Sequence, residues 1–483
     1  MYPLVYRRIL ENAAKNPNKM ALICPGEEEL SYARLKQHIM GARNYLIKAD
    51  VRPGEYVLLA ASRSFSFVYA YLAVHSLGAV AVPLDPQTPV ARLNYIRDIL
   101  LPKAGFWVSG DHGLADITIF DKLEDDNSVE DILINADMTA DVMFTSGTTA
   151  LPKGVRLTHG NLSCAVNNIN MFVGNGNNDV EINPMPLSHS FGLARLRCTL
   201  YEGATQVIID GVMRPKALFG AMDEYKVTGI GMVAPAWMVL KRLSGDTISR
   251  FSNQLRYLEL GSAPMAAEEK AHLAALLPQT RVCMHYGLTE ASRAAFQEFH
   301  EPSESLSTVG RPSPLVEIRI HSESGECLPE GEIGEICVKG GMVTKGYLNV
   351  DNETAFWGDY FRTGDLGYIR TDGYIVLTGR LKEMINVGGK KVSPFEVEQA
   401  LTALSGIVEA ACVGAPDPLA GEVVAAFVVS SGGETYTLKE MRNLLAGVLE
   451  SHQLPSYLSY VKELPKTVSG KVQRLQLKDL LPS

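Results

Sequence analysis

Short apolar runs alternate with helix-like segments from the N-terminus to about residue 380, and this alternation limits the possible folds more than any other feature. Residues 65–77 have the pattern of a buried helix, and residues 79–84 that of a buried strand. Further short apolar runs, at 205–210 and 256–260, end at polar or glycine residues. Such alternation is typical of α/β layers in which helices cover the sheets. A chain of 483 residues is too long for one ordinary core, so we expect two or more domains.

The pattern changes after residue 315. Residues 331–338 indicate a β-hairpin region, and Thr371-Asp372-Gly373 between two strand-like runs predicts a hairpin turn. The C-terminal segment predicts a small α+β unit, with helices at 396–404 and 438–451 and strands at 407–413 and 423–429. The expected fold class is therefore α/β, with a large N-terminal domain of several subdomains and covered sheets, a β-hairpin region, and a small α+β C-terminal domain.

The composition argues against some classes of partner. Hydrophobic residues make up 46% and charged residues 20%, and the formal net charge is −9. A mildly acidic chain gives no reason to expect nucleic acid or an anionic membrane as its main partner. No apolar run reaches the roughly 18 residues that span a bilayer, and the N-terminus lacks the order of a signal peptide. The seven cysteines show no metal-binding spacing, which suits reduced, buried thiols, so we expect a cytoplasmic protein without a membrane span.

The most specific segment is a loop that follows the short apolar strand at 141–144. Its successive backbone N–H groups and hydroxyls can wrap phosphate oxygens, and its lysine adds positive charge. The order differs from a Walker A loop, and the spacing of the closing Pro152-Lys153-Gly154 argues against a plain surface turn. The candidate phosphate-binding residues are Thr145, Ser146, Gly147, Thr148, Thr149 and Lys153.

With this loop the chain resembles the adenylate-forming superfamily of AMP-dependent synthetases and ligases, which includes acyl- and aryl-CoA synthetases, peptide-synthetase adenylation domains and luciferase. The resemblance covers essentially the whole chain, and the motifs occur in the family's order. It implies ATP and Mg²⁺ as cofactors and a small-molecule carboxylic acid as substrate. One departure is Ala150, where the family usually has glycine, and alanine stiffens the loop without removing a charge or a donor.

A second motif, residues 284–291, resembles the family's Tyr-Gly-x-Thr-Glu segment. The resemblance implies that Tyr286, followed by Gly287, packs on adenine, that Thr289 contacts the α-phosphate, and that Glu290 ligates Mg²⁺. An aromatic face suits a base, and a carboxylate suits a hard cation between phosphates. Upstream, a short turn resembles the one that lines the family's adenine and acyl pocket; it consists of Gly261, Ser262, Ala263 and Pro264.

The C-terminal motifs carry the remaining implied roles. Asp365 and Arg380 would contact the ribose, and Lys382 matches the family's hinge, which divides the chain into domains 1–380 and 381–483, the second one mobile. Lys471 matches the family's catalytic lysine, which would touch the carboxylate and the α-phosphate. The loop that would line the thiol tunnel holds Gly388, Gly389 and Lys390, although Lys390 and Lys391 also fit a solvated charge pair.

The identities of the acid and the thiol are less constrained. Pocket candidates are His189, Phe191, Trp237, Ala291 and Arg293, and Trp237 could shorten the pocket in favour of a small or medium acyl or aryl group. By resemblance His189 or its neighbour gates the acyl pocket, but His189 could also be a plain core or capping histidine. Arg293 could pair with a second carboxylate or a polar substituent, or could be a solvated or interface residue. We expect a separate thiol acceptor, CoA first, with the phosphopantetheine of a free-standing acyl carrier protein as the alternative.

Two further classes of function remain open. One is a luciferase-like oxygenase, which also begins with adenylation. The other is a non-catalytic nucleotide-binding regulator, against which the joint presence of Lys471, Glu290 and Asp365 argues, since a binding module needs no swinging lysine. The interpretation that fits best is a ligase that forms an acyl-AMP with release of pyrophosphate and then a thioester.

Overall fold

The computed structural model describes residues 2–122, 132–145, 152–350, 352–432, 435–466 and 472–481. The chain divides into two compact units. Unit 1 contains residues 1–317 and 338–361, and unit 2 contains residues 318–337 and 362–483. The hairpin region that precedes residue 380 thus groups largely with unit 2, and a hinge at Lys382 stays a prediction.

Nine described strands form the largest sheet of unit 1. Its interior strands are parallel, and β2, β14 and β15 are antiparallel edge strands. In spatial order the strands are β15 (Arg311–Pro312), β14 (Ala295–Glu298), β13 (Arg281–Tyr286), β12 (Tyr257–Gly261), β11 (Gly229–Val233), β9 (Val180–Asn183), β10 (Thr205–Ile208), β1 (Met20–Cys24) and β2 (Glu28–Ser31).

A second sheet of unit 1 contains six described strands. All of them are parallel except β8, which returns antiparallel to β7. In spatial order they are β6 (Ala115–Asp116), β5 (Ala104–Trp107), β3 (Tyr56–Ala60), β4 (Val80–Leu84), β7 (Thr139–Thr145) and β8 (Lys153–Thr158).

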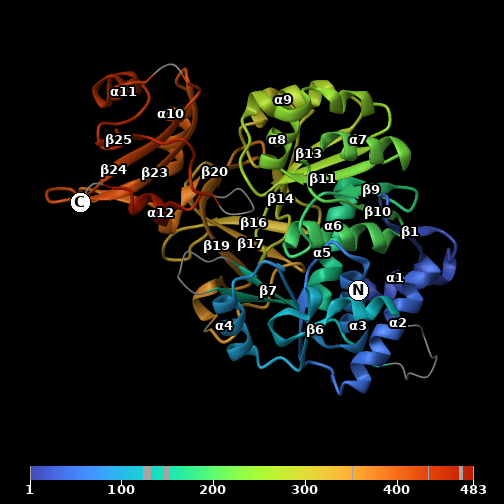
Figure 1. The fold of residues 1–483 in the computed structure, drawn as a ribbon. Helices are drawn as coiled ribbons and strands as arrows, with labels where there is room; N and C mark the ends of the chain where they lie inside the picture. The colour runs from blue at the N-terminus through green and yellow to red at the C-terminus, as the bar shows by residue number, and fades with distance from the viewer. Residues whose placement is uncertain are drawn as a thin grey trace. The chain divides into compact units, whose positions relative to one another are not determined.

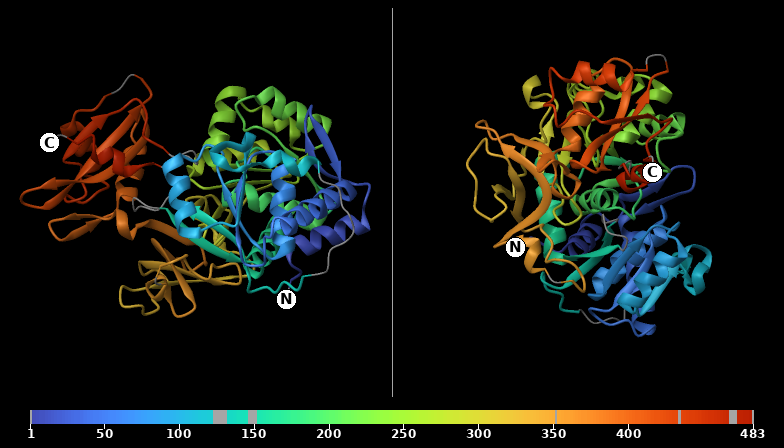
Figure 2. Two further views of the ribbon diagram at one scale, coloured as in Figure 1. Left: turned by 60° about the horizontal axis from the view of Figure 1, so that its bottom comes forward. Right: turned by 90° about the vertical axis from the view of Figure 1, so that its left-hand side faces the viewer.

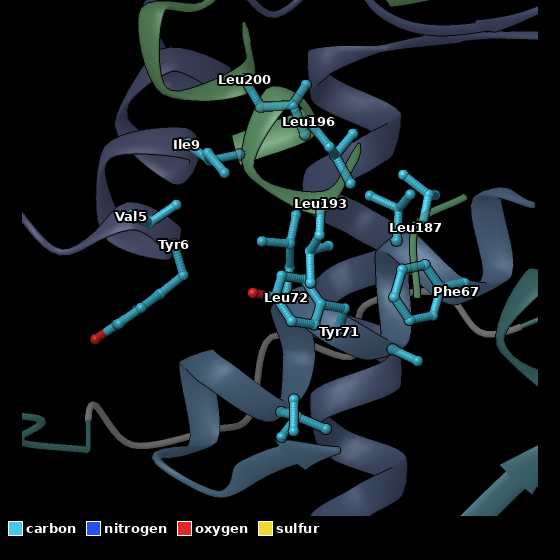
Figure 3. Packing of buried hydrophobic residues seen from close by; sticks show 14 of the residues in the cluster. Val5, Tyr6, Ile9, Phe67, Tyr71, Leu72, Leu187, Leu193, Leu196 and Leu200 are labelled. Atoms are coloured by element: carbon cyan, nitrogen blue, oxygen red, sulfur yellow. The ribbon is translucent and has the colours of Figure 1, made fainter. Parts of the chain in front are cut away.

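Helices cover both faces of both sheets, as the alternation in the sequence predicts. A central layer packs between the sheets (Figure 1) and contains α1 (Val5–Lys15), α2 (Tyr32–Lys48), α3 (Phe65–Leu77), α5 (His159–Val173) and α6 (Ser190–Glu202). Figure 3 shows how apolar side chains of α1, α3 and α6 gather in this layer. The outer face of the nine-stranded sheet carries α7 (Pro215–Glu224), α8 (Ala234–Ser244) and α9 (Ala267–Leu276), and that of the six-stranded sheet carries α4 (Val90–Leu100).

Strand residues alternate between these helix layers. In β3, Val57 and Leu59 join the central core, whereas Leu58 and Ala60 join the core under α4. In β12, Tyr257 faces the central core and Leu258 the outer one. Because side chains along a strand point alternately to opposite faces, a sheet covered on both sides needs such continuous apolar runs.

The central helix α3 lacks an amphipathic pattern. All of its residues are buried, because α2 and α6 flank it and β3 and β4 lie behind it. A helix enclosed on every side is apolar all round. The prediction of a buried helix over residues 65–77 is confirmed with the same bounds, and the predicted strand at 79–84 is found at Val80–Leu84.

Unit 2 begins with hairpin strands. β19 and β20 pair around the predicted turn, in which Gly373 has a φ of 83° and donates its N–H to the Arg370 carbonyl. The strands of this sheet are β16 (Val316–His321), β17 (Gly334–Gly340), β18 (Phe356–Trp357), β19 (Tyr360–Ile369) and β20 (Ile375–Arg380); β16, β17 and β19 run from one unit into the other, and β18 lies within unit 1.

The C-terminal part of unit 2 is the predicted α+β module. Its long antiparallel strand pair, β23 and β24, is drawn in orange-red in Figure 2. Helices α10 and α11 pack on one face of the sheet, and α12 packs on the other. The predicted helix at 438–451 ends at Leu445, just before Ala446-Gly447, where glycine disfavours the helix. The elements are β21 (Ile385–Val387), β22 (Lys390–Val392), α10 (Pro394–Thr402), β23 (Ile407–Asp417), β24 (Gly421–Ser430), α11 (Leu438–Leu445), β25 (Tyr457–Tyr460) and α12 (Arg474–Lys478).

Short 3₁₀ turns join several elements: Val108–Gly113, Ile117–Lys122, Thr247–Phe251, Ser303–Ser305, Glu353–Ala355 and Leu381–Glu383. None of the helices in the described ranges combines the length and apolar character needed to cross a bilayer. All seven cysteines are free thiols; Cys198, Cys283, Cys337 and Cys412 are buried, whereas Cys327 is exposed.

Candidate active site

The predicted phosphate loop connects two paired strands of the six-stranded sheet. β7 ends at Thr145 and β8 begins at Lys153, and these two residues are direct partners in the antiparallel ladder. The two ends of the loop are therefore held together by the sheet itself. The loop residues Ser146, Gly147, Thr148, Thr149 and Ala150 lie outside the described residues.

A tyrosine that no motif predicted lies between the loop lysine and the predicted metal ligand. The Lys153 ammonium lies over the Tyr347 ring, 5.2 Å from its centroid. The Tyr347 hydroxyl donates a hydrogen bond of 2.8 Å to Oε1 of Glu290. The structure thus brings together Lys153 and Glu290, which belong to different motifs. Lys153 begins β8 of the six-stranded sheet, and Glu290 follows β13 of the nine-stranded sheet.

The turn after β13 carries the second motif and depends on its glycine. A Cβ atom on Gly287 would lie 2.6 Å from the Arg293 backbone nitrogen and 2.8 Å from the Ala291 carbonyl oxygen. Leu288 and Ala291 exchange backbone hydrogen bonds across this turn. The turn buries Glu290 to 8% exposure and leaves Tyr286 and Thr289 half-buried.

The third predicted element, residues 261–264, follows β12, the parallel neighbour of β13. A Cβ atom on Gly261 would lie 2.2 Å from the His285 ring, so glycine is required where the strands meet. Ser262 has a φ of 73°, while Ala263 is half-buried and Pro264 is exposed. This turn and the Tyr286–Glu290 turn leave the carboxyl ends of adjacent parallel strands, where open α/β sheets bind ligands.

Beneath these turns lies a network of buried charges that the sequence did not suggest. Nε of Arg195 donates to Glu181 at 2.9 Å and its Nη1 to Glu259 at 3.1 Å. Glu259 also accepts from Nε of Arg293 at 3.0 Å and lies 2.7 Å from Nδ1 of His285. Arg195, Glu181 and Glu259 have no side-chain exposure. An isolated buried charge is costly, so the two guanidinium groups and two carboxylates must balance one another.

The pKa shifts follow from this burial. Burial alone would raise the pKa of Glu259, but the guanidinium groups of Arg293 and Arg195 outweigh it and hold that pKa well below its usual range. Burial, reinforced by Arg293, lowers the pKa of His285. The network is therefore neutral near pH 7, with Glu259 ionised and His285 uncharged.

The candidate pocket residues fall in different surroundings. Phe191 begins α6 and packs its ring 4.6 Å from the His285 ring and 4.5 Å from the Arg293 guanidinium. His189 occupies the N-cap position of the same helix without a side-chain capping hydrogen bond, and it is exposed. Ala291 is fully buried and forms an antiparallel bridge with Val343.

Arg293 and Trp237 are more deeply placed than the sequence suggested. Arg293 is 2% exposed and has a φ of 54°, so the alternative of a solvated arginine is wrong. Trp237 is fully buried in the outer core, and its indole N–H donates to Glu269 on α9 at 2.7 Å. This packing does not support Trp237 as a wall of the acyl pocket, and that role stays a prediction.

Unit 2 carries the candidates for ribose and thiol contact. Asp365, on β19, is 1% exposed, and Arg380, opposite it on β20, places Nε 2.8 Å from its Oδ1. Gly388 and Gly389, with φ of 58° and 84°, form an exposed two-residue turn between β21 and β22, where positive φ at both positions favours glycine. Lys382 and Lys390 are exposed, and Lys471 lies outside the described residues.

The described residues contain no group of three or more side chains arranged to hold a metal ion by themselves. Mg²⁺ is usually held by one or two carboxylates together with water and substrate phosphates. Glu290 beside the phosphate-loop lysine fits that mode, because it offers a single carboxylate at the place where phosphates are expected.

Two protein families match the sequence: AMP-binding enzyme at residues 9–348 and AMP-binding enzyme C-terminal domain at residues 396–471. The oxalate–CoA ligase of Arabidopsis thaliana is 31% identical over 96% of each chain. The feruloyl-CoA synthase of an Amycolatopsis species is 30% identical over 92% of this chain and 93% of its own.

Solved structures give the same result. ATP-bound MatB from Rhodopseudomonas palustris superimposes with a TM-score of 0.91, 26% identity and 99% coverage of both chains. The o-succinylbenzoate CoA synthetase MenE from Bacillus subtilis, in complex with its acyl-adenylate, superimposes with a TM-score of 0.86, 26% identity and 98% coverage of both. The similarity thus extends along nearly the whole chain.

Proposed function

The chain belongs to the AMP-binding enzyme family, and from this membership we propose that it joins a carboxylic acid to CoA through an acyl-adenylate. The observation that carries the proposal is the placement of Lys153 and Glu290 on either side of Tyr347, a cation and an anion of the kinds that hold Mg-ATP. A thiol cannot readily displace oxide from a carboxylate, whereas AMP is a good leaving group.

In the first half-reaction the carboxylate attacks the α-phosphorus in line, its oxygen–phosphorus bond forms, and pyrophosphate departs. Negative charge spreads over the phosphate oxygens, so fixed donors and cations aimed at them lower the barrier. Lys153, Thr145 and Thr289 would supply such contacts in unit 1. Mg²⁺ bound at Glu290 would neutralise part of the phosphate charge. Lys471 and the loop hydroxyls would complete the set.

Adenine and the ribose would be bound by different groups. We assign adenine to the half-buried face of Tyr286, beside the Gly261–Pro264 turn, since an aromatic face suits a base. The ribose hydroxyls would donate to Asp365, a carboxylate that its ion pair with Arg380 orients. These assignments predict that Asp365→Asn raises KM for ATP while leaving KM for the acid unchanged.

The charge balance of the buried network favours an acyl group that carries a neutral polar acceptor. Nη2 of Arg293 is buried and has no hydrogen-bond partner within the described residues. A carbonyl or hydroxyl oxygen would satisfy it, whereas a second carboxylate would add an unbalanced charge to a neutral network. Hydroxycinnamic acids therefore fit better than short dicarboxylic acids, although the relatives include an oxalate–CoA ligase.

Pyrophosphate exchange tests the adenylation step and the acid together. ATP–pyrophosphate exchange should appear with at least one member of a panel containing hydroxycinnamic, succinylbenzoic and short dicarboxylic acids. Faster exchange with dicarboxylic acids than with hydroxylated aryl acids would contradict the assignment to Arg293. No exchange with any acid would instead favour a nucleotide-binding regulator.

The two half-reactions can be separated by variants. We expect Lys471→Ala to abolish exchange but to spare thioester formation from supplied acyl-AMP, with the exposed Lys478→Ala on α12 as the matched control. Gly389→Trp should do the converse, because a large side chain on the exposed turn would obstruct the path of the thiol. Equal loss of both half-reactions in Lys471→Ala would refute this division of roles.

An acyl carrier protein is the second candidate for the thiol that accepts the acyl group. The exposed Gly388–Gly389 turn, next to Lys390, would suit the phosphopantetheine arm of CoA as well as that of an acyl carrier protein. Supplying each thiol to the enzyme with acyl-AMP, and following thioester by mass spectrometry, decides between them. CoA is expected to be the faster acceptor.

A further inference from the structure

Tyr347 is the residue that connects the two charged groups of the proposed ATP site, and no motif marks it. We propose that Tyr347 is a positioning residue that holds the Glu290 carboxylate for Mg²⁺ and the Lys153 ammonium for the phosphates, while keeping the two from pairing with each other. The inference rests on the proposed function, because it assigns these two groups to Mg-ATP.

The backbone around Tyr347 is clamped from two sides. Tyr347 forms an antiparallel bridge with Val155 on β8, the strand that begins at Lys153. Its N–H donates to Oδ1 of Asn352 at 2.7 Å, and the Asn352 amide returns a hydrogen bond to its carbonyl at 3.1 Å. The ring position is therefore fixed relative to the strand that carries the lysine.

The same segment is tied to the metal-ligand turn. The Thr344 N–H donates to the Glu290 carbonyl at 2.8 Å, and Val343 bridges Ala291. Residues 343–347 thus lie between β8 and the Glu290 turn and contact both through the backbone. A displacement of Tyr347 would change the separation of the two motifs.

The side-chain contacts leave both charges usable. Glu290 is 8% exposed and needs a donor, which the Tyr347 hydroxyl supplies to Oε1; within the described part of the chain Oε2 accepts no hydrogen bond and remains available to a cation. Lys153 lies over the ring face and makes no ion pair with any described carboxylate. A direct Lys153–Glu290 pair would neutralise the groups that must meet phosphate and Mg²⁺.

Two substitutions separate the two contacts. Tyr347→Phe keeps the ring over Lys153 and removes only the hydrogen bond to Glu290, so the Mg²⁺ concentration for half-maximal ATP binding should rise about tenfold or more, as expected for a hydrogen bond to a charged group. Tyr347→Leu also removes the cation–π contact and should weaken ATP binding by roughly a further two- to fivefold. KM for the acid should stay unchanged in Tyr347→Phe.

Tyr201→Phe is the matched control. The Tyr201 ring also lies beside an arginine, with Arg8 5.9 Å from its centroid, and its hydroxyl accepts a side-chain hydrogen bond from Nδ2 of Asn167 at 3.1 Å. Tyr201 lies on α6 outside the proposed site, so its variant should bind ATP with the Mg²⁺ dependence of the unmodified protein.

Isothermal titration of ATP at several Mg²⁺ concentrations measures the Mg²⁺ dependence of ATP binding without requiring turnover. A Tyr347→Phe variant with the Mg²⁺ dependence of the unmodified protein would overturn the proposal. A variant that is less stable and whose ATP affinity falls by the same factor at every Mg²⁺ concentration would also overturn it. Absence of pyrophosphate exchange in the unmodified protein would remove the proposed function, but the comparison of ATP binding would still decide the role of Tyr347.

Discussion

Helix α6 carries two buried arginines two residues apart that reach opposite sheets of unit 1. Arg195 pairs with Glu181 and Glu259 of the nine-stranded sheet. Arg197 donates to Oδ2 of Asp141, on β7 of the six-stranded sheet, at 2.8 Å. Since β7 leads into the phosphate loop and β12 into the adenine turn, α6 links the two halves of the proposed ATP site. We predict that Arg197→Met destabilises unit 1 strongly.

The magnitude follows from burial. Asp141 has no side-chain exposure and also accepts hydrogen bonds from Tyr71 at 2.9 Å and His75 at 2.8 Å. Removing one partner of a buried pair leaves an uncompensated charge and costs about 3–5 kcal/mol. Removing both charges is often nearly neutral, so the double variant Arg197→Met with Asp141→Asn should recover most of that loss.

The assay uses the chain's own fluorophores. All three tryptophans, Trp107, Trp237 and Trp357, belong to unit 1, so their emission during urea unfolding reports that unit. With a denaturant slope of about 3 kcal/mol/M, the single variant should lose about 1–1.7 M in its midpoint. Circular dichroism would show whether unit 2 unfolds separately, in which case only the tryptophan transition is analysed.

An exposed ion pair supplies the control. Arg250 and Asp223 lie 3.3 Å apart with side chains 61% and 52% exposed, so Arg250→Met should cost less than about 1 kcal/mol. If the double variant at Arg197 and Asp141 lost as much stability as the sum of the two single variants, the two charges would not compensate each other, which would refute the prediction.

Three further outcomes are expected. Gly287→Ala should reduce ATP–pyrophosphate exchange by at least about tenfold, because its Cβ would meet the Arg293 backbone nitrogen at 2.6 Å; near-normal exchange would show that the turn can move. Burial lowers the pKa of Lys270 to about 8 from 10.5, so the unfolded chain binds the extra proton between these values and stability rises with pH through that window. Relative to Lys270→Met, the unmodified protein should therefore gain up to about 3 kcal/mol between pH 7 and pH 10.5, and parallel pH profiles would contradict this. Trp237→Phe should lose about 1–3 kcal/mol with the hydrogen bond to Glu269 and leave the order of preferred acids unchanged, whereas a changed order would return the ring to the acyl pocket.

The sequence by itself determined the α/β layers and the motif-bearing turns. Apolar runs such as Val80–Leu84 identify strands covered on both faces, because every side chain along them is buried. The Gly287 turn can be predicted from the sequence for a related reason. Its backbone conformation depends on consecutive residues, so the required residue types stand together in the chain. Chemistry that needs a local backbone shape leaves a local pattern.

The sequence misplaced the end of one helix, and the cause is local. The helix expected to reach residue 451 stops at Leu445, since helical periodicity continues past a glycine that disfavours the helix. The hairpin strands before residue 380 group with unit 2 because β19 pairs with β17 and β20 contacts α10, contacts that no local pattern records.

Only the tertiary structure decided which distant residues act together. Tyr347 and Glu290 are 57 positions apart, and Arg197 and Asp141 are 56 apart, yet each pair is joined by a hydrogen bond of 2.8 Å. A lone tyrosine or arginine has no pattern that distinguishes a buried, partnered side chain from a solvated one, as Arg293 shows. Burial and partnership arise from the packing of α6 between two sheets and of residues 343–347 beside β8, and that packing is a property of the whole fold.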